Sequence, residues 1–229
     1  MGKVKGLSFD MYRTLLDTRD FHEQAVREIL SRWAGDSVDP EVFHTRWDEH
    51  YDDVHLAMSQ DQFMTEREVA VESLRRALRE FGIDADPVVG VDMWMGKYGR
   101  ADLFPEVEEV LSILSERYPM VILSNVDNDD LGYAVIREKN LPFLAIITSH
   151  SLRSYKPDGK MFEEVLSVLK CQPEEVLHIG DSQRSDVLGA KKAGMLAAWL
   201  NRRGGKLKSG IPEPDYEITS LRELLDLDL

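Results

Sequence analysis

The segment VKGLSFDMYRTLLD, residues 4–17, decides the fold. Its first six residues form a short, mainly apolar run that ends at Asp10, which is typical of a buried strand whose carboxyl end presents a carboxylate. After residue 100, similar runs alternate with helical periods, which predicts an α/β fold with a doubly wound, parallel, Rossmann-like sheet. The later strands are expected at 120–123, 144–148, 176–179 and 195–200.

A helical domain is expected to interrupt this sheet after its first strand. Between residues 21 and 98 the apolar residues recur with the period of a helix. Asp39-Pro40 and Asp86-Pro87 each place a capping residue before a proline, which is the pattern of a helix start. We therefore expect an inserted cap of about four helices at 17–99 and a core formed by 1–16 and 100–229.

Composition excludes several classes of protein. The formal charge of −14 over 229 residues argues against wholesale binding to nucleic acid or to an anionic membrane. A single cysteine, Cys171, excludes an internal disulfide framework, and no apolar run is long enough to span a bilayer. Residues 1–6 lack the apolar region of a signal peptide, so we expect a cytoplasmic protein. The sequence leaves the oligomeric state open.

Polar side chains follow four predicted strands, where ligands of open α/β sheets bind, and they are Asp10, Ser124-Asn125, Ser149 and Asp181. Asp10 in such a place can be a nucleophile, a metal ligand or a helix cap. Asp181 and Asp186 can hold Mg²⁺, which prefers oxygen ligands, or can serve as an N-cap and a first-turn acid of the next helix. The Ser124 hydroxyl and the Asn125 amide suit the orientation of substrate oxygens, and they equally suit a turn.

Lys156 follows a long loop and precedes Pro157, where we expect a helix to begin. A lysine in this place is either solvated, without a role in the site, or it brings a compact cation over the strand ends. In the second case its ammonium would neutralise Asp10 and a bound anion.

Four motifs occur in a fixed order: FDMYRTLLD (residues 9–17), VILSN (121–125), SYKPDG (154–159) and HIGDSQRSDVLGAKKAGM (178–195). Together they resemble the haloacid dehalogenase (HAD) superfamily, whose hydrolases use an aspartate nucleophile. The resemblance covers nearly the whole chain, because the helical insert sits where that family has its cap domain.

The resemblance implies a two-step substitution in which Asp10 forms an ester that water then cleaves. Thr14 and Ser124 would hold the substrate oxygens, and Lys156 would offset negative charge. Mg²⁺ would reduce the repulsion between the attacking carboxylate and an anionic phosphate. Its implied ligands are Asp10, the main-chain carbonyl of Tyr12, Asp181 and Asp186.

Two positions depart from the pattern of the family's phosphatases. Tyr12 stands where they carry a second Asp that protonates the leaving group, and the family's 2-haloacid dehalogenases have Tyr in this place. Arg13 stands where the family usually has Gly, and it is either a substrate-binding cation or a member of a surface salt bridge. Asp181 favours the phosphatases, since the dehalogenases need no metal and have Ser there.

We therefore predict Mg²⁺-dependent dephosphorylation of a small phosphorylated metabolite through an aspartyl-phosphate, with Tyr12, Arg13 and Asn125 in contact with the substrate. One alternative is metal-free hydrolysis of a carbon–halogen bond in a 2-haloacid. Another is a catalytically weak protein that binds a phosphorylated ligand. His178 is interpreted as a core residue, and a partial match of residues 127–138 to a calcium loop is rejected because Leu131 occupies a ligand position.

Overall fold

A computed structural model describes residues 4–58 and 62–229. Residues 1–3, on which the expected lack of a signal peptide partly rests, lie outside the described residues. Six strands form one sheet in the order β3-β2-β1-β4-β5-β6, with every neighbouring pair parallel. The predicted doubly wound α/β fold is thereby confirmed. The strands are β1 (Gly6–Phe9), β2 (Met120–Ser124), β3 (Ala145–Thr148), β4 (Val176–Gly180), β5 (Leu196–Leu200) and β6 (Tyr216–Ile218).

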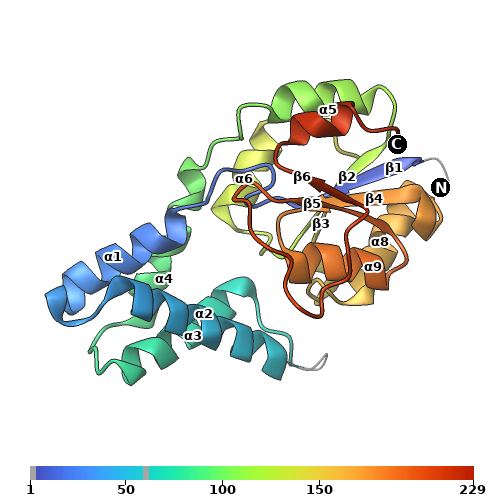
Figure 1. Cartoon of the computed structure of the whole chain (residues 1–229). Coiled ribbons are helices and arrows are strands. Elements are labelled where there is room, and N and C mark those ends of the chain that lie inside the picture. The colour runs from blue at the N-terminus through green and yellow to red at the C-terminus, as the bar shows by residue number, and fades with distance from the viewer. Residues whose placement is uncertain (1–3, 59–61) are drawn as a thin grey trace. The chain divides into compact units, whose positions relative to one another are not determined.

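Helices cover both faces of the sheet. Figure 1 shows α5 (Val107–Ser115) on one side of the strands, and α8 (Gly159–Leu169) and α9 (Gly189–Lys192) on the other. The central strands are buried on both faces, which explains their nearly continuous apolar sequences. Shorter elements are α7 (Ser149–Leu152), a π-helical turn at Gln183–Leu188 that precedes α9, and a 3₁₀ helix at Leu221–Leu225.

The chain divides into two compact units. The first, the α/β unit, comprises residues 1–17, 102–125 and 136–229 and contains the sheet. The second, the helical unit, comprises residues 18–101 and 126–135. Residues 126–135 were predicted to belong to the core, but in the structure they group with the helical unit.

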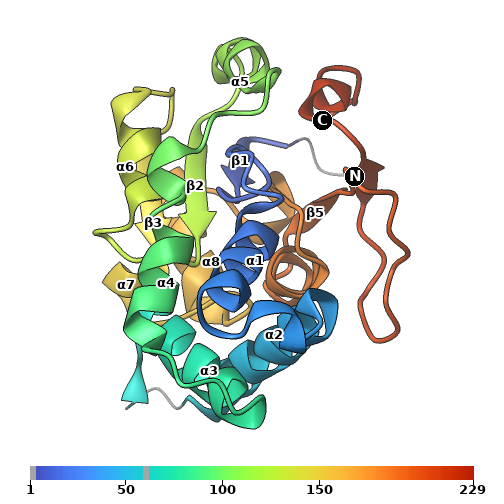
Figure 2. The ribbon, with the colours of Figure 1, turned by 90° about the vertical axis from the view of Figure 1, so that its left-hand side faces the viewer.

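Among the described residues of 18–101, four α-helices form most of the helical unit, and α2 and α3 lie side by side in it (Figure 2). Their apolar faces enclose a core that includes Ile29, Trp47, Leu74 and Val91. The predicted helix starts at Asp39 and Asp86 are confirmed, because each side chain accepts hydrogen bonds from the first turn. The helices are α1 (Phe21–Trp33), α2 (Pro40–Ala57), α3 (Glu66–Glu80) and α4 (Pro87–Met95).

Several sequence-based boundaries need correction. Helix α6 (Leu131–Glu138) and strand β6 are absent from the prediction, since α6 lies in the segment weighed only as a calcium loop and β6 has three residues. Helix α8 begins at Gly159 instead of Pro157, because the Asp158 side chain accepts a hydrogen bond from the Lys160 amide and caps the helix.

Asp127 joins residues 126–135 to the helical unit. Its carboxylate is buried and accepts hydrogen bonds from the amides of Glu66 (3.0 Å) and Arg67 (2.9 Å), while Thr65 accepts from the Glu68 amide (3.2 Å). The first three amides of α3 are therefore all satisfied, two of them by a residue about sixty positions away in sequence.

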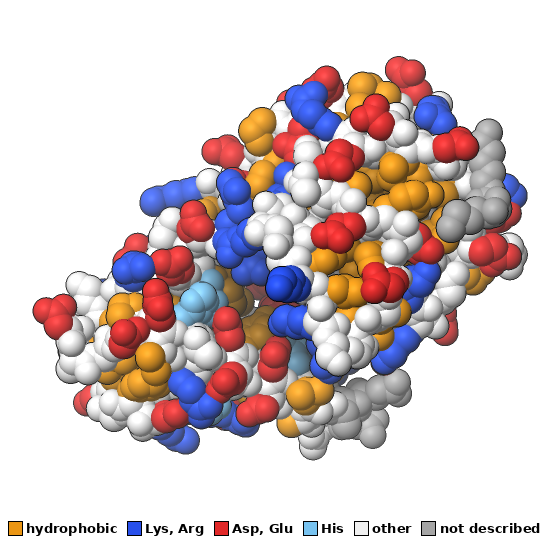
Figure 3. Space-filling view, viewed as in Figure 1, with side chains coloured by type: hydrophobic (Ala, Val, Ile, Leu, Met, Phe, Trp, Pro, Cys, Tyr) orange, Lys and Arg blue, Asp and Glu red, His pale blue; other side chains and the backbone are white. Residues whose placement is uncertain are grey.

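None of the helices within residues 4–58 and 62–229 combines the length and the hydropathy of a membrane span. Acidic and basic side chains are interspersed on the face of the molecule that Figure 3 shows.

We predict that Asp127→Ala lowers the free energy of unfolding by about 1–2 kcal/mol, because two buried amides at the start of α3 lose their acceptor. Urea unfolding followed by circular dichroism measures the effect. The matched control is Asp129→Ala, which removes an exposed carboxylate from the same segment. An equal effect of the two substitutions would contradict the capping role of Asp127.

Candidate active site

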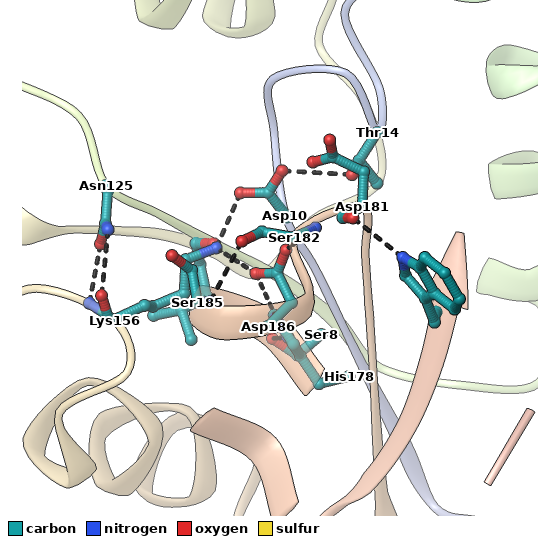
Figure 4. A network of polar contacts seen from close by, with 12 residues as sticks. Ser8, Asp10, Thr14, Asn125, Lys156, His178, Asp181, Ser182, Ser185 and Asp186 are labelled. Carbon is teal, nitrogen blue, oxygen red and sulfur yellow. Dashed lines mark hydrogen bonds and ion pairs between the residues drawn. The ribbon is translucent and has the colours of Figure 1, made fainter. Parts of the chain in front are cut away.

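The sheet brings the predicted polar residues to one edge. Asp10 follows β1, Ser124 closes β2 and Asp181 follows β4. In register, Phe9 of β1 pairs with Ile122 of β2 and with Ile179 of β4, so the three parallel strands end side by side. Figure 4 shows the Asp10, Asp181 and Asp186 side chains gathered there with Lys156. All of these residues belong to the α/β unit.

Lys156 lies at the centre of the group and is buried. Its ammonium donates to Asp10 Oδ1 (2.7 Å), to Asp186 Oδ1 (2.7 Å) and to the carbonyl oxygen of Leu123 (2.8 Å). An ammonium has three donors, so these acceptors satisfy it completely. Of the two interpretations that the sequence left open for Lys156, the structure therefore supports the cation at the strand ends.

Asn125 contacts the backbone of Lys156 in both directions. Its side-chain oxygen accepts from the Lys156 amide (2.8 Å), and its amide nitrogen donates to the Lys156 carbonyl (3.3 Å). These contacts hold the backbone of Lys156 beside the end of β2, whereas Asn125 was predicted to contact substrate. Ser124 is buried, and its hydroxyl makes no hydrogen bond to another described residue, so it remains available to a substrate oxygen.

The turn after β1 carries the other predicted residues. Thr14 donates from its hydroxyl to Asp10 Oδ2 (3.1 Å), and Tyr12 is partly buried. Arg13 has a φ of 60°, which is the left-handed region that a residue with a Cβ seldom adopts. Its guanidinium lies 3.8 Å from the Asp181 carboxylate and is half exposed. This placement suits both readings of Arg13, a surface ion pair and a cation near a bound anion.

Asp186 is held by two further contacts. Its Oδ2 accepts from the Ser182 amide (2.8 Å), and its Oδ1 lies 3.1 Å from His178 Nε2. The other ring nitrogen of His178 lies 2.9 Å from the Ser8 hydroxyl, which fixes the orientation of the ring. A Cβ added to Gly180 would lie 2.3 Å from the Asp186 carboxylate, so only glycine leaves room for it at this position.

The three acids differ in their electrostatic environment. Burial beside the negative charges of Asp10 and Asp186 raises the pKa of Asp181 to about 7. Burial also acts to raise the pKa of Asp186, but Lys156 and His178 outweigh it and hold this pKa well below its usual range. The pKa of Asp10 is raised, chiefly by burial, although Lys156 opposes the shift.

These acids fit a divalent cation. One oxygen from each of Asp10, Asp181 and Asp186 lies within 4.8 Å of the others. Asp181 accepts no side-chain hydrogen bond from the described residues, and Arg13 is the described cation nearest to it. An oxygen-only set in which one carboxylate is poorly compensated suits Mg²⁺, which is commonly held by one or two carboxylates together with water.

Three residues around Asp186 were not predicted to belong to the site, and they are His178, Ser8 and Gly180. His178 is buried, as expected, but its contact with Asp186 goes beyond a packing role. The sequence did contain a signal for this contact. Ser8 lies two residues before Asp10, and His178 lies two residues before Gly180, the neighbour of Asp181. The two residues pair with each other between β1 and β4. Their pairing could not be inferred without the strand order.

Comparisons with known proteins agree with these observations. A model of the haloacid dehalogenase-like hydrolases matches residues 4–194. The (S)-2-haloacid dehalogenase of Pseudomonas sp. (strain YL) is 26% identical over 99% of this chain and 95% of the relative. The N-acylneuraminate-9-phosphatase of Rattus norvegicus is 24% identical over 98% of this chain and 93% of the relative. The relatives thus include proteins named for each of the two reactions.

Among solved structures, the HAD-hydrolase YfnB from Bacillus subtilis, bound to magnesium, matches with a TM-score of 0.77. It is 23% identical, and the match covers 98% of both chains. This likeness shows the fold.

We predict that Asp181→Asn stabilises the metal-free protein above neutral pH. Because the pKa of Asp181 is about 7 when folded and near 3.9 when unfolded, the folded state binds more protons between these values. The free energy of unfolding therefore falls as pH rises from about 4 to about 7, and the substitution removes this loss. Urea unfolding in EDTA at a series of pH values measures it.

The difference should shrink as pH approaches 4, and saturating Mg²⁺ at pH 8 should stabilise the wild type more than the variant. Asp102→Asn, an exposed acid of the same unit, is the matched control and should change little. Greater wild-type stability in EDTA at pH 8 would contradict the prediction.

We predict that Gly180→Ala costs about 1–3 kcal/mol of stability, because the added methyl group displaces the Asp186 carboxylate. Thermal unfolding measures the change, and a crystal structure of the variant reports the position of Asp186. Gly159→Ala is the control, since its Cβ would meet only ordinary contacts. An unchanged Asp186 would refute the steric argument.

Proposed function

The chain belongs to the haloacid dehalogenase-like hydrolases, and we propose that it is a Mg²⁺-dependent phosphatase of a small phosphorylated metabolite. The observation that carries this proposal is the third acid. Asp181 lies with Asp10 and Asp186 at the strand ends, and its pKa is raised by burial and by the negative charges of these two neighbours. Two buried acids and one partly buried acid beside one fully engaged lysine are best stabilised by a divalent cation.

In this proposal, Asp10 is the nucleophile. A carboxylate oxygen of Asp10 attacks phosphorus, the bond from phosphorus to the leaving oxygen breaks, and an aspartyl-phosphate forms. Water then attacks the phosphorus of this ester, which releases inorganic phosphate and regenerates the Asp10 carboxylate. The ammonium of Lys156, 2.7 Å from Asp10, keeps the buried carboxyl available as an anion despite the desolvation that raises its pKa.

Mg²⁺ would be held by Asp10, Asp181 and Asp186, with the main-chain carbonyl of Tyr12 as a further ligand, and would neutralise charge on the transferring group. We expect the Ser124 hydroxyl, which makes no competing hydrogen bond to a described residue, to donate to a phosphate oxygen. The single hydroxyl proton of Thr14 is directed at Asp10 Oδ2, and we expect it to turn to a phosphate oxygen when the substrate binds.

Tyr12 limits the leaving groups that the site can expel. Its phenol has an unperturbed pKa near 10, so it protonates a leaving oxygen less readily than a carboxylic acid does. We therefore expect faster turnover of aryl phosphates, which leave as stabilised phenolates, than of alkyl phosphates. The helical unit is proposed to act as the cap that supplies substrate contacts.

Metal-free hydrolysis of a 2-haloacid is the second candidate, and Tyr12 favours it because halide leaves without a proton. The relative from Pseudomonas sp. (strain YL) is named for that activity. Asp181 argues against it, since a reaction with a monoanionic haloacid gains nothing from a third carboxylate near the nucleophile.

We predict that the protein hydrolyses 4-nitrophenyl phosphate in the presence of Mg²⁺ and that EDTA abolishes this activity reversibly. Asp10→Asn removes the nucleophile and should lower kcat on the order of 10³-fold or more. Asp181→Asn should raise the Mg²⁺ concentration needed for half-maximal rate. Release of 4-nitrophenolate measures all three effects.

The controls separate the candidates. Chloride release from (S)-2-chloropropionate that persists in EDTA, without phosphatase activity, would replace the proposal by the dehalogenase. Binding of phosphate or a phosphate mimic with neither activity would indicate a phospholigand-binding protein instead.

A further inference from the structure

A second group of metal-ligating side chains lies in the helical unit. His22 is at the start of α1, and His44 and Asp48 are one turn apart on α2, so both α2 residues face the same neighbour. None of the three belongs to the acid site or is involved in the proposed reaction. Figure 3 shows histidine side chains at the surface of the helical unit, among acidic ones.

The ligand atoms of these residues form a small triangle, whose third corner is the Asp48 carboxylate with both of its oxygens. His22 Nδ1 lies 3.0 Å from His44 Nε2 and 3.2 Å from Asp48 Oδ1, and His44 Nε2 lies 3.6 Å from Asp48 Oδ2. The contact between the two nitrogens is a hydrogen bond, which requires a proton on one of them. A cation that displaces this proton would receive a lone pair from each imidazole and from the carboxylate.

The edge lengths match a tetrahedral ion. Zinc binds imidazole nitrogen at about 2.0–2.1 Å and carboxylate oxygen at about 2.0–2.2 Å, so neighbouring ligands of a tetrahedral site lie about 3.3 Å apart. The observed edges of 3.0, 3.2 and 3.6 Å bracket this value.

The surroundings hold the first ligand in place. The His22 ring stacks on Trp94 at 4.5 Å between ring centroids and meets the edge of Trp47 at 4.3 Å. Both tryptophans belong to the buried core of the helical unit. The His22 side chain is 16% exposed and that of His44 33%, so an ion can enter while much of its surroundings is fixed.

We propose that His22, His44 and Asp48 bind a divalent transition-metal ion, with Zn²⁺ as the best match and a water molecule as the fourth ligand. Two imidazoles and one carboxylate suit zinc, nickel, copper or iron, whereas the oxygen-only acids of the α/β unit suit Mg²⁺. The two sites thus differ in the ions that they select. Because the ligands come from α1 and α2, the ion would link these helices and stabilise the helical unit.

Equilibrium dialysis of the full chain against ZnCl₂, with excess Mg²⁺ present to occupy the acid site, tests this proposal. We expect one equivalent of zinc per chain. His44→Ala and Asp48→Asn should each weaken binding by more than about 10-fold, because each removes a direct ligand, and the loss of an outer-shell partner alone costs 10–100-fold. Asp48 is well exposed, so its variant should fold normally.

A second readout is the geometry. Co²⁺ in place of Zn²⁺ should give the strong visible absorption of a tetrahedral site in the wild type, and this absorption should be lost in His44→Ala. Zinc should also raise the unfolding temperature of the wild type and not that of His44→Ala.

Three controls locate the ion. His50→Ala removes a histidine of α2 that pairs with Glu80 outside the triangle, and zinc binding should persist. Binding should also persist in Asp10→Asn and in Cys171→Ser. The proposal is overturned if the wild type binds no stoichiometric zinc, if His44→Ala and Asp48→Asn bind it as tightly as the wild type, or if Asp10→Asn or Cys171→Ser abolishes binding.

Discussion

The buried ammonium of Lys156 is the contact on which the acid site depends. It lies between Asp10 and Asp186 and also donates to a carbonyl of β2, so it joins the turn after β1, the end of β2 and the π-helical turn after β4. Without it, two buried carboxylates would face each other with no adjacent cation, a situation that costs several kcal/mol. Asn125 fixes the backbone that carries this lysine, which ties the loop before α8 to the end of β2.

The same arrangement explains why the three acids are not equivalent. Lys156 and His178 compensate Asp186 and lower its pKa. Burial and the neighbouring acids raise the pKa of Asp181, and Arg13 and Lys156 offset this shift only in part. Asp186 is thus held in its charged form, whereas Asp181 gains or loses a proton near neutral pH. A divalent cation bound to the three acids would reduce this difference in their pKa values. Tyr12, which stands where the family's phosphatases have Asp, affects protonation of the leaving group and not the charge of the acid cluster.

Sequence was informative wherever a local pattern had one physical cause. The runs at β1, β2 and β4 are buried on both faces, and the Asp-Pro pairs start α2 and α4 through direct caps, so these elements could be predicted. The acids at the strand ends followed from the same reasoning. The contact of His178 with Asp186 and the role of Asn125 depend on neighbours that only the folded sheet brings close. Strand β6 was missed because three residues carry too little periodicity.

The segment 126–135 has a consequence for the modularity of this chain. Because Asp127 caps α3, the helical unit is not one continuous segment from residue 18 to residue 101 but needs a second segment, 126–135. If residues 18–101 were transferred alone to another protein, the amides at the start of α3 would lose Asp127 as their acceptor. If 18–101 were deleted from this chain, Asp127 would remain two residues after Asn125 without the amides that it caps. We therefore expect that a functional exchange of the helical unit between relatives must transfer 18–101 and 126–135 together.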